Sequence, residues 1–259
     1  MSGPSALAGR HAVITGASRG IGAAIASALA AEGMRLSLLG RDAAALAQVV
    51  EACGPDTAHG IVADVSDQTA VARAMDEARA RFGPVHVLVN NAGQAASAKF
   101  TETGPELWNR ILGVNLTGTY LCTRAVVADM LQGGYGRIVN IASIAGLRGG
   151  AYLSAYVTSK HAVVGLTRAL ALEYATRGIT VNAVCPGYVD TDIVKNAIAN
   201  IARKTGRSAE EALATLVATN PQGRLVTCEE VAAAVLYLCR PGSDSVTGQS
   251  LVLAGGEVT

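Results

Sequence analysis

Residues His11 to Gly22 read HAVITGASRGIG, and this stretch decides the fold. A β-rich run, His11–Thr15, leads directly into Gly16-Ala17-Ser18-Arg19-Gly20-Ile21-Gly22, and an alanine-rich helical pattern follows. Glycines at a strand-to-helix turn let the backbone approach a pyrophosphate, which then lies at the positive end of the helix. Three glycines alone are weak evidence, because tight turns need them anyway. Their position at the first strand of an alternating chain indicates a dinucleotide site.

The rest of the chain repeats this order of strand and helix. Short β-rich runs alternate with longer segments that carry apolar residues at helical spacing, which predicts a mostly parallel sheet with helices on both faces. Of the 259 residues, 50% are hydrophobic, enough for one large core, so we expect a single domain over residues 1–259. The predicted class is α/β, a Rossmann-type doubly wound sheet of seven parallel strands. The expected strands are His11–Thr15, Arg35–Leu39, Gly60–Ala63, Val85–Val89, Arg137–Ala142, Ile179–Val184 and Ser250–Leu253.

Helix punctuation supports this register. A Ser or Thr followed three residues later by Glu has the spacing of a capping box, in which each side chain bonds the backbone of the other. Three pairs have it: Thr103/Glu106, Ser208/Glu211 and Thr227/Glu230. The segment Asp190 to Arg224 is different, because it holds two short helical patterns where the alternation predicts a compact crossover. It is either a flap that covers the substrate or a plain helical insertion.

Charge and cysteine patterns exclude several classes of partner. The chain carries 21 basic and 20 acidic residues and no run of five like charges, so neither nucleic acid nor a membrane is an expected partner. The five cysteines and four histidines lack any zinc-like spacing, and no metal is expected. The N-terminus lacks a secretory signal pattern and no apolar run reaches membrane-spanning length. These features predict a soluble cytoplasmic protein with reduced thiols.

Tyr156-Val157-Thr158-Ser159-Lys160 is the sharpest chemical signal. Tyr and Lys four residues apart share one face of a helix. An ammonium beside a phenol stabilises the phenolate and lowers the phenol pKa from about 10 toward neutrality, so the oxygen can exchange a proton with a carbonyl or hydroxyl. The same spacing arises by chance on solvated helices. Its weight therefore comes from the motifs that accompany it.

Polar residues follow other expected strands at the sheet edge where open α/β folds bind ligands. Asp64-Val65 follows the third strand, Asn90-Asn91-Ala92-Gly93 the fourth and Ser143 the fifth, while Asn115 lies in a helical segment from Trp108 to Ala128. Each is ordinary turn chemistry by itself. Asp64 fits equally well as a carboxylate that fixes its own loop.

Together these motifs resemble the classical short-chain dehydrogenase/reductase family. The resemblance rests on TGASRGIG, NNAG, a following helical asparagine, a serine thirteen residues before the tyrosine, YxxxK and Pro186-Gly187, and it runs from His11 to about Gly256. It implies a nicotinamide-dependent enzyme that interconverts a ketone and a secondary alcohol. On this interpretation Ser143 hydrogen-bonds the substrate oxygen and Tyr156 exchanges its proton. Lys160 binds the nicotinamide ribose and tunes the tyrosine, and Asn115 holds a water in a proton relay.

The resemblance also implies which residues surround the cofactor. It assigns the glycine turn and the NNAG segment to the dinucleotide, Asp64 and Val65 to the adenine edge, and Pro186 to Thr191 to the nicotinamide side. The implied cofactor-binding set is Gly16, Ser18, Arg19, Gly20, Ile21, Gly22, Asp64, Val65, Asn91, Ala92, Gly93, Tyr156, Lys160, Pro186, Gly187, Val189 and Thr191.

The second expected strand ends without the acidic residue that grips a ribose 2′-hydroxyl. The chain reads Leu38-Leu39-Gly40-Arg41 there, and a guanidinium accommodates a 2′-phosphate through bidentate hydrogen bonds. Arg19 can reach the same region. NADP(H) is therefore favoured, with Arg41 in the cofactor site. NAD(H) is the alternative, if Asp42 takes the ribose hydroxyls and Arg41 is only a surface residue at a helix start.

Loops beyond the sheet edge set the substrate in this family. They are apolar and carry few charges, which suits an apolar or extended ketone, and the expected substrate contacts are Gln94, Ile144, Leu153 and Tyr188. Gly136–Gly165 and Gly178–Gly187 resemble bacterial polyketide ketoreductases and 3-oxoacyl-thioester reductases. We expect reduction of a polyketide-type ketone or of a CoA or carrier-protein thioester. Basic residues that could meet such phosphates, or form a solvated face, are Arg148, Lys195, Arg203, Lys204 and Arg207.

The sequence leaves two alternative functions open and also predicts an oligomeric state. A 3-hydroxyacyl-CoA dehydrogenase working in the oxidative direction is the alternative enzyme, and a non-catalytic dinucleotide-sensing regulator is the alternative of a different class. Relatives pair through the helices expected at Trp108–Met130 and Ser154–Ala175, which predicts a homotetramer. The tail Ala254-Gly255-Gly256-Glu257 departs from the pattern of the housekeeping fatty-acid enzyme.

Overall fold

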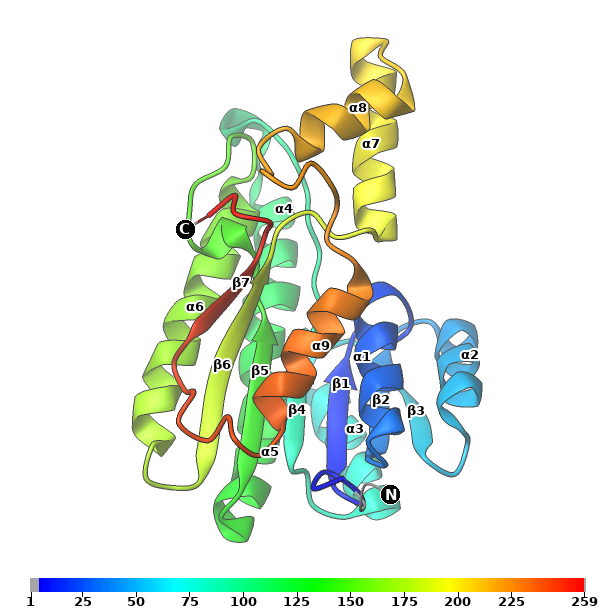
Figure 1. Cartoon of the computed structure of the whole chain (residues 1–259), viewed down its shortest axis with the longest axis vertical. Coiled ribbons are helices and arrows are strands. Elements are labelled where there is room, and N and C mark those ends of the chain that lie inside the picture. The colour runs from blue at the N-terminus through cyan, green and yellow to red at the C-terminus, as the bar shows by residue number, and fades with distance from the viewer. Residues whose placement is uncertain (1–4, 259) are drawn as a thin grey trace.

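The computed structural model describes residues 5–258, which form one sheet with helices on both faces (Figure 1). Its seven strands are all parallel and lie in the order β3-β2-β1-β4-β5-β6-β7. The predicted fold class is confirmed, and every expected strand is present with ends shifted by at most two residues. The strands are β1 His11–Thr15, β2 Arg35–Gly40, β3 Ala58–Val62, β4 Val87–Asn90, β5 Gly136–Ile141, β6 Ile179–Pro186 and β7 Ser250–Leu253.

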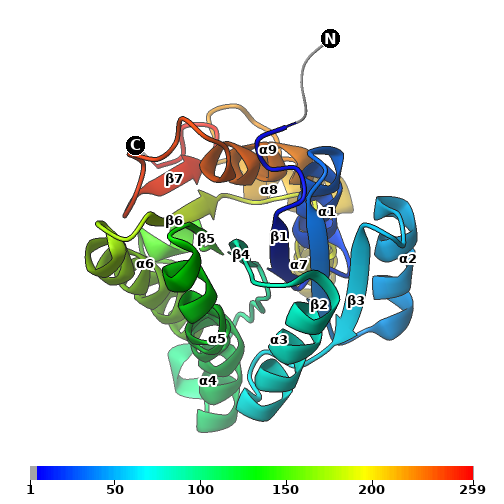
Figure 2. The same cartoon turned by 90° about the horizontal axis from the view of Figure 1, so that it is seen from below.

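Helices α1, α2 and α9 cover one face of the sheet, and α3, α5 and α6 cover the other (Figure 2). Helix α4 precedes α5, whereas α7 and α8 stand above the carboxyl edge of the strands (Figure 1). The bounds are α1 Gly20–Ala31, α2 Ala43–Cys53, α3 Gln68–Phe82, α4 Pro105–Leu112, α5 Gly118–Gly133, α6 Ser154–Tyr174, α7 Asp192–Thr205, α8 Ala209–Val217 and α9 Cys228–Cys239.

The core lies in two layers, one on each side of the sheet. Neighbouring residues of a strand point to opposite faces, so Ile14 of β1 packs with Ile25 of α1, while Val13 packs with Met75 of α3 and Val126 of α5. All five of these side chains are buried. Burial on both faces explains why the strands read as nearly continuous apolar runs.

Two of the three expected capping boxes are present. Ser208 accepts a hydrogen bond from the backbone of Glu211 and Glu211 bonds back, and Thr227 and Glu230 do the same for α9. The third expectation was wrong. Helix α4 begins at Pro105, whose fixed φ suits the first helical position, so the cap falls on Gly104 and the Thr103 hydroxyl donates to the Lys99 carbonyl instead.

A single helical stretch of 29 residues, Pro105–Gly133, replaces the shorter helix expected at Trp108–Ala128. It consists of α4, a π-helical turn at Gly113–Thr117 and α5. By length and a mean hydropathy of 1.2 over one 18-residue window it could cross a membrane, contrary to the expectation that no apolar run is long enough. In this fold α5 packs against α3, β4 and β5, so the stretch forms part of the core around the sheet.

The segment Asp190 to Arg224 contains two helices, as predicted, joined through Gly206 with a φ of +71°. Its two ends meet at its base, where Val189 and Val226 form a parallel bridge. Asp190 N donates to Val226 O at 2.9 Å, and Val226 N donates to Tyr188 O at 2.9 Å. The segment is therefore an excursion from the sheet edge that returns to its starting point.

Candidate active site

The glycine turn between β1 and α1 leaves a cradle of bare backbone. A Cβ on Gly16 would lie 2.8 Å from Ala92 Cα, and one on Gly22 would lie 2.6 Å from Asn91 Nδ2, so neither position tolerates a side chain. Gly16 and Gly20 also adopt positive φ. Arg19 caps α1 without a side-chain hydrogen bond, so no side-chain cap satisfies the first backbone N–H groups of this helix. The cradle fits a pyrophosphate.

Asn91 holds the glycine turn in place. Its Nδ2 donates to the carbonyls of Thr15, at 3.0 Å, and Gly16, at 2.9 Å. Backbone N–H groups of Asn91 and Ala92 both donate to Thr15 Oγ1 at 3.0 Å. The side chain of Asn91 therefore shapes the cofactor cradle, and Ala92 with Gly93 continues it toward the catalytic residues.

Arg41 and Asp64 lie together at the ends of β2 and β3. Arg41 Nη1 is 3.9 Å from Asp64 Oδ2, and both side chains are largely exposed. Hydrogen bonds from Ser66 hold the pKa of Asp64 below its usual value, and the charge of Arg41 lowers it further. Because Asp64 accepts these bonds from Ser66, it also fixes its own loop.

Asp42 caps α2 by accepting from Ala45 N at 3.1 Å. Val65 is buried, with its side chain against Gly118.

Ser143, Tyr156 and Lys160 converge at the carboxyl ends of β5 and β6. Ser143 follows β5 and its hydroxyl donates to Pro186 O at 3.4 Å. Tyr156 and Lys160 lie on the first turns of α6, and Lys160 Nζ is 5.8 Å from the centre of the Tyr156 ring. Lys160 is 5% exposed and its Nζ donates to Ile141 O at 2.7 Å. The sequence predicted from spacing that Tyr156 and Lys160 share one helix face, and the family resemblance implied that Ser143 acts with them.

The expected direction of the tyrosine pKa was wrong for the protein without a bound ligand. Burial raises the pKa of Tyr156, and the Ser143 hydroxyl opposes this only in part. Burial also lowers the pKa of Lys160 to about 8. Burial is the largest cause, and the Lys160 ammonium bonds the Ile141 carbonyl instead of the phenol oxygen. Tyr156 is therefore held as the neutral phenol, the form that donates a proton.

Asn115 lies in the π-helical turn and is almost fully buried. Its Oδ1 accepts from Gln94 N at 2.8 Å, and its Nδ2 donates to Gln94 O at 2.9 Å and to Ser159 Oγ at 3.0 Å. The side chain thus links the segment after NNAG to the catalytic helix α6. A π turn is a frequent feature of functional sites, because its extra residue shifts side chains out of helical register.

The remaining expected residues line the two sides of this centre. On the nicotinamide side, Gly187 N donates to Leu253 O at 2.9 Å, and Val189 is buried. Thr191 lies against the glycine turn, since a Cβ on Gly20 would lie 3.3 Å from Thr191 Cγ2.

On the substrate side, Gln94 and Leu153 are half-buried and Tyr188 is exposed. Ile144 is buried at the start of a short 3-10 turn.

Residues 10–202 match the family model described as short chain dehydrogenase. The chain belongs to the short-chain dehydrogenase family. It is accordingly an NAD(P)-dependent oxidoreductase that acts on an alcohol or ketone. The glycine turn, NNAG and the Ser-Tyr-Lys group all lie inside the matched range.

Relatives within the short-chain dehydrogenase family cover the chain almost from end to end. It is 42% identical over 257 residues, 98% of this chain and 94% of the relative, to the "Granaticin polyketide synthase putative ketoacyl reductase 1" of Streptomyces violaceoruber. It is 38% identical to the D-beta-hydroxybutyrate dehydrogenase of Rhizobium meliloti, over 95% and 98% of the two chains. A solved structure of a variant of actinorhodin polyketide ketoreductase with NADPH superposes with a TM-score of 0.92 at 40% identity, covering 96% of this chain and 97% of that chain.

The tail of this short-chain dehydrogenase contributes residues that sequence reasoning gave no role. Glu257 is buried beside Gly187 and pairs with Arg148 and Thr219. Arg148 thus has an internal partner, although it was expected to meet phosphate or solvent. The departure of residues 254–257 from the expected pattern was the one available signal.

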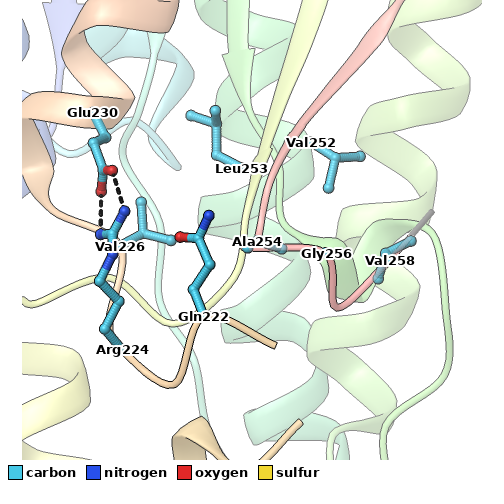
Figure 3. A pocket seen from close by; sticks show the side chains of 10 residues that line it. Gln222, Arg224, Val226, Glu230, Val252, Leu253, Ala254, Gly256 and Val258 are labelled. Atoms are coloured by element: carbon cyan, nitrogen blue, oxygen red, sulfur yellow. Dashed lines mark hydrogen bonds and ion pairs between the residues drawn. The ribbon is translucent and has the colours of Figure 1, made fainter. Parts of the chain in front are cut away.

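A cavity of about 380 Å³ opens behind the tail, away from the catalytic residues. Figure 3 shows Arg224 paired with Glu230 on one side and Leu253 and Val252 on the other. The pair is 2.6 Å apart, and both side chains are well exposed. None of Ser143, Tyr156 and Lys160 lines this cavity, so it is separate from the catalytic centre.

Proposed function

We propose that this enzyme uses NADPH to reduce a ketone, either a polyketide-type ketone or a 3-oxoacyl thioester, to a secondary alcohol. The observation that carries the proposal is the grouping of Ser143, Tyr156 and Lys160 beside a cofactor cradle whose adenosine end presents Arg41. Tyr156 can give the carbonyl oxygen the proton that it needs as it becomes a hydroxyl. The likeness to polyketide ketoreductases supports the substrate class.

The residues of this chain supply orientation and the proton. Bound NADPH supplies the hydride for the carbonyl carbon. Ser143 donates a hydrogen bond to the carbonyl oxygen, and Tyr156 gives that oxygen its hydroxyl proton. The Lys160 ammonium offsets the negative charge left on the Tyr156 oxygen. Asn115 keeps α6 and the segment at Gln94 in fixed relation, so that the substrate meets both donors at once.

Three features of the adenosine end support NADP(H) over NAD(H). β2 ends at Gly40, so no carboxylate stands where a ribose 2′-hydroxyl would be gripped. The Asp42 carboxylate caps α2 and is therefore engaged. Arg41 is 64% exposed, and its only ion pair within residues 5–258 is the long contact with Asp64. A 2′-phosphate placed there would meet a guanidinium with free donors.

Exposed apolar side chains support a bulky or extended ketone. Tyr152, Tyr188 and Ile193 are 63%, 37% and 54% exposed on the loop before α6, after β6 and on α7. Tyr152 is also the one non-glycine residue of the described chain with positive φ, at 65°. Such strain persists where surrounding structure imposes it and is frequent at ligand sites. We propose that these residues and the α7–α8 segment cover the substrate.

The test is the initial rate of NADPH and NADH oxidation with a 3-oxoacyl thioester and with a bulky bicyclic ketone. We expect at least one ketone to be reduced, faster with NADPH. Tyr156→Phe should lose activity by about 10²- to 10⁴-fold while it still binds NADPH. Oxidation of a 3-hydroxyacyl-CoA that outpaces every reduction would favour the dehydrogenase alternative, which the hydroxybutyrate dehydrogenase relative supports. If no ketone or alcohol is turned over while NADPH still binds tightly, the non-catalytic dinucleotide-sensing regulator would be favoured.

The proposed assembly is a homotetramer in the cytoplasm. Tyr120 on α5 and Leu172 on α6 are large apolar side chains with 45% and 82% exposure, and such side chains on neighbouring helices suit an interface. The five cysteines are all free, which suits a reducing compartment.

A further inference from the structure

The mechanism above leaves one buried carboxylate on the substrate side without a role. The Glu257 side chain is 1% exposed. Its Oε1 accepts hydrogen bonds from Arg148, in the loop after Ser143, and from Thr219, which comes just after α8. Its Oε2 faces Gly187, where a Cβ would lie 3.5 Å away. Three elements that flank the substrate side therefore meet on one carboxylate.

The backbone of the tail is shaped to deliver Glu257 to this place. Gly255 and Gly256 adopt φ values of +58° and +91° as they pass the turn that ends the α7–α8 segment. A Cβ on Gly255 would lie 2.8 Å from Asn220 Cγ, and one on Gly256 would lie 3.3 Å from Pro221 Cγ. The tail thus packs backbone-first on the Asn220-Pro221 turn.

Tyr188 directly follows Gly187, the residue that the Glu257 carboxylate faces. Burial raises the pKa of the Tyr188 phenol, the charge of Glu257 raises it further, and Arg148 opposes the rise. The Tyr188 phenol in turn contributes to the raised pKa of Tyr156.

We propose that Glu257 is a positioning residue, which joins the α8 end of the α7–α8 segment to the loop after Ser143 and so fixes the substrate side of the site. This rests on the proposed function in one respect, that the α7–α8 segment covers the substrate. The Val189–Val226 bridge holds the base of the segment through backbone alone and does not depend on Glu257. Loss of the carboxylate should loosen the α8 end and leave the cofactor cradle intact.

The kinetic test compares Glu257→Gln, Arg148→Met and the double variant with wild type on whichever ketone wild type reduces. We expect the KM for the ketone to rise about 10-fold in each, with kcat changed less than about 3-fold, because uniform substrate binding is lost. The Kd for NADPH should stay within about 2-fold, and the double variant should be no worse than either single one, as for partners in one contact. Arg148→Lys should recover part of the KM.

Trypsin measures the same link without turnover. Arg203, Lys204 and Arg207 are exposed around the α7–α8 turn. Cleavage there should be about 5-fold faster in Glu257→Gln, since local opening exposes the chain.

Glu32→Gln is the matched control, because Glu32 pairs with Arg240 far from the site and is also mostly buried. Thr219→Val, which removes one hydrogen bond, should shift both readouts in the same direction and by less, and it serves if Glu257→Gln does not fold.

The outcomes separate the two proposals. Faster cleavage in Glu257→Gln or Thr219→Val, with no ketone reduced by wild type, would reject the proposed function and keep the link. The link is overturned if these variants change KM and cleavage no more than Glu32→Gln does. It is equally overturned if NADPH affinity falls as far as ketone affinity, since the effect would then be general.

Discussion

Lys160 is proposed to act in the chemistry, but the burial of its ammonium lowers the stability of the folded protein. Its ammonium is buried with one hydrogen bond, to the Ile141 carbonyl. Burial lowers its pKa to about 8 from the ordinary value of 10.5 that it has in the unfolded chain. Between these values the unfolded chain binds more protons, so the free energy of unfolding rises with pH from about 8 to about 10.5. Below pH 8 the cost of burying the charge is fully present.

Replacing Lys160 should therefore stabilise the protein without cofactor. The same replacement should abolish ketone reduction when NADPH is present. We expect Lys160→Met to raise the free energy of unfolding at pH 7 by about 1 to 3 kcal/mol, since one pKa unit corresponds to about 1.4 kcal/mol. The gain should shrink above pH 8. Urea unfolding at pH 7 and pH 10 measures both values, and a variant less stable than wild type at pH 7 would contradict this account.

Arg41 carries a second prediction at this scale. Arg41→Ala should raise the KM for NADPH by about 10- to 100-fold, because the charged hydrogen bonds between the guanidinium and the 2′-phosphate are lost. The KM for NADH should stay nearly unchanged, because NADH has no 2′-phosphate. Arg35→Ala is the matched control, because Arg35 is exposed at the opposite end of the same strand. Equal losses for both cofactors would place Arg41 outside the 2′-phosphate site.

At the scale of elements, the turn between β1 and α1 also depends on close packing at Gly22. Gly22 has ordinary helical φ, yet a Cβ there would press on Asn91, which holds the turn. We expect Gly22→Ala to weaken NADPH binding by at least about 10-fold, because the cradle must shift. Gly133→Ala, on α5 with open space around it, should bind NADPH normally and be stabilised by about 0.5 to 1 kcal/mol. Calorimetric titration and thermal unfolding give both numbers.

The elements also show what the sequence could and could not predict. The strands were predictable from hydrophobic periodicity, and the shared helix face of Tyr156 and Lys160 was predictable from their spacing. The grouping of Ser143 with them was implied by the family resemblance. The π turn at Asn115 was not predictable, since the sequence there reads as one continuous helix, while the turn itself contacts α6, which is far away in the chain. Neither was the role of Glu257, which depends on contacts between residues far apart in the chain. The tyrosine pKa was misjudged because spacing places Lys160 on the right face but does not show how deeply the phenol is buried.

For the whole molecule, the exposed apolar residues of α5 and α6 predict assembly. Light scattering should give about 105 kDa, four chains of 26.3 kDa. Leu172→Glu should shift the mass toward smaller species, since a charge at an apolar interface is desolvated without a partner. Val62→Glu, at an equally apolar exposed position on β3, should leave the mass unchanged. A monomer in the wild type would rule the tetramer out.

The order of strands in the sheet has a consequence for how the chain folds. β1 pairs with β2 across a short connection, Ala12 with Leu36, but its other neighbour is β4, where Ala12 pairs with Val87. Closing that central pair requires a much longer loop, and such non-local pairings slow folding. The bonds from Asn91 to Thr15 and Gly16 form only once the two strands have met. Affinity for the dinucleotide should therefore appear late in refolding, and an excess of nucleotide should trap the molecules that have joined the two halves of the sheet.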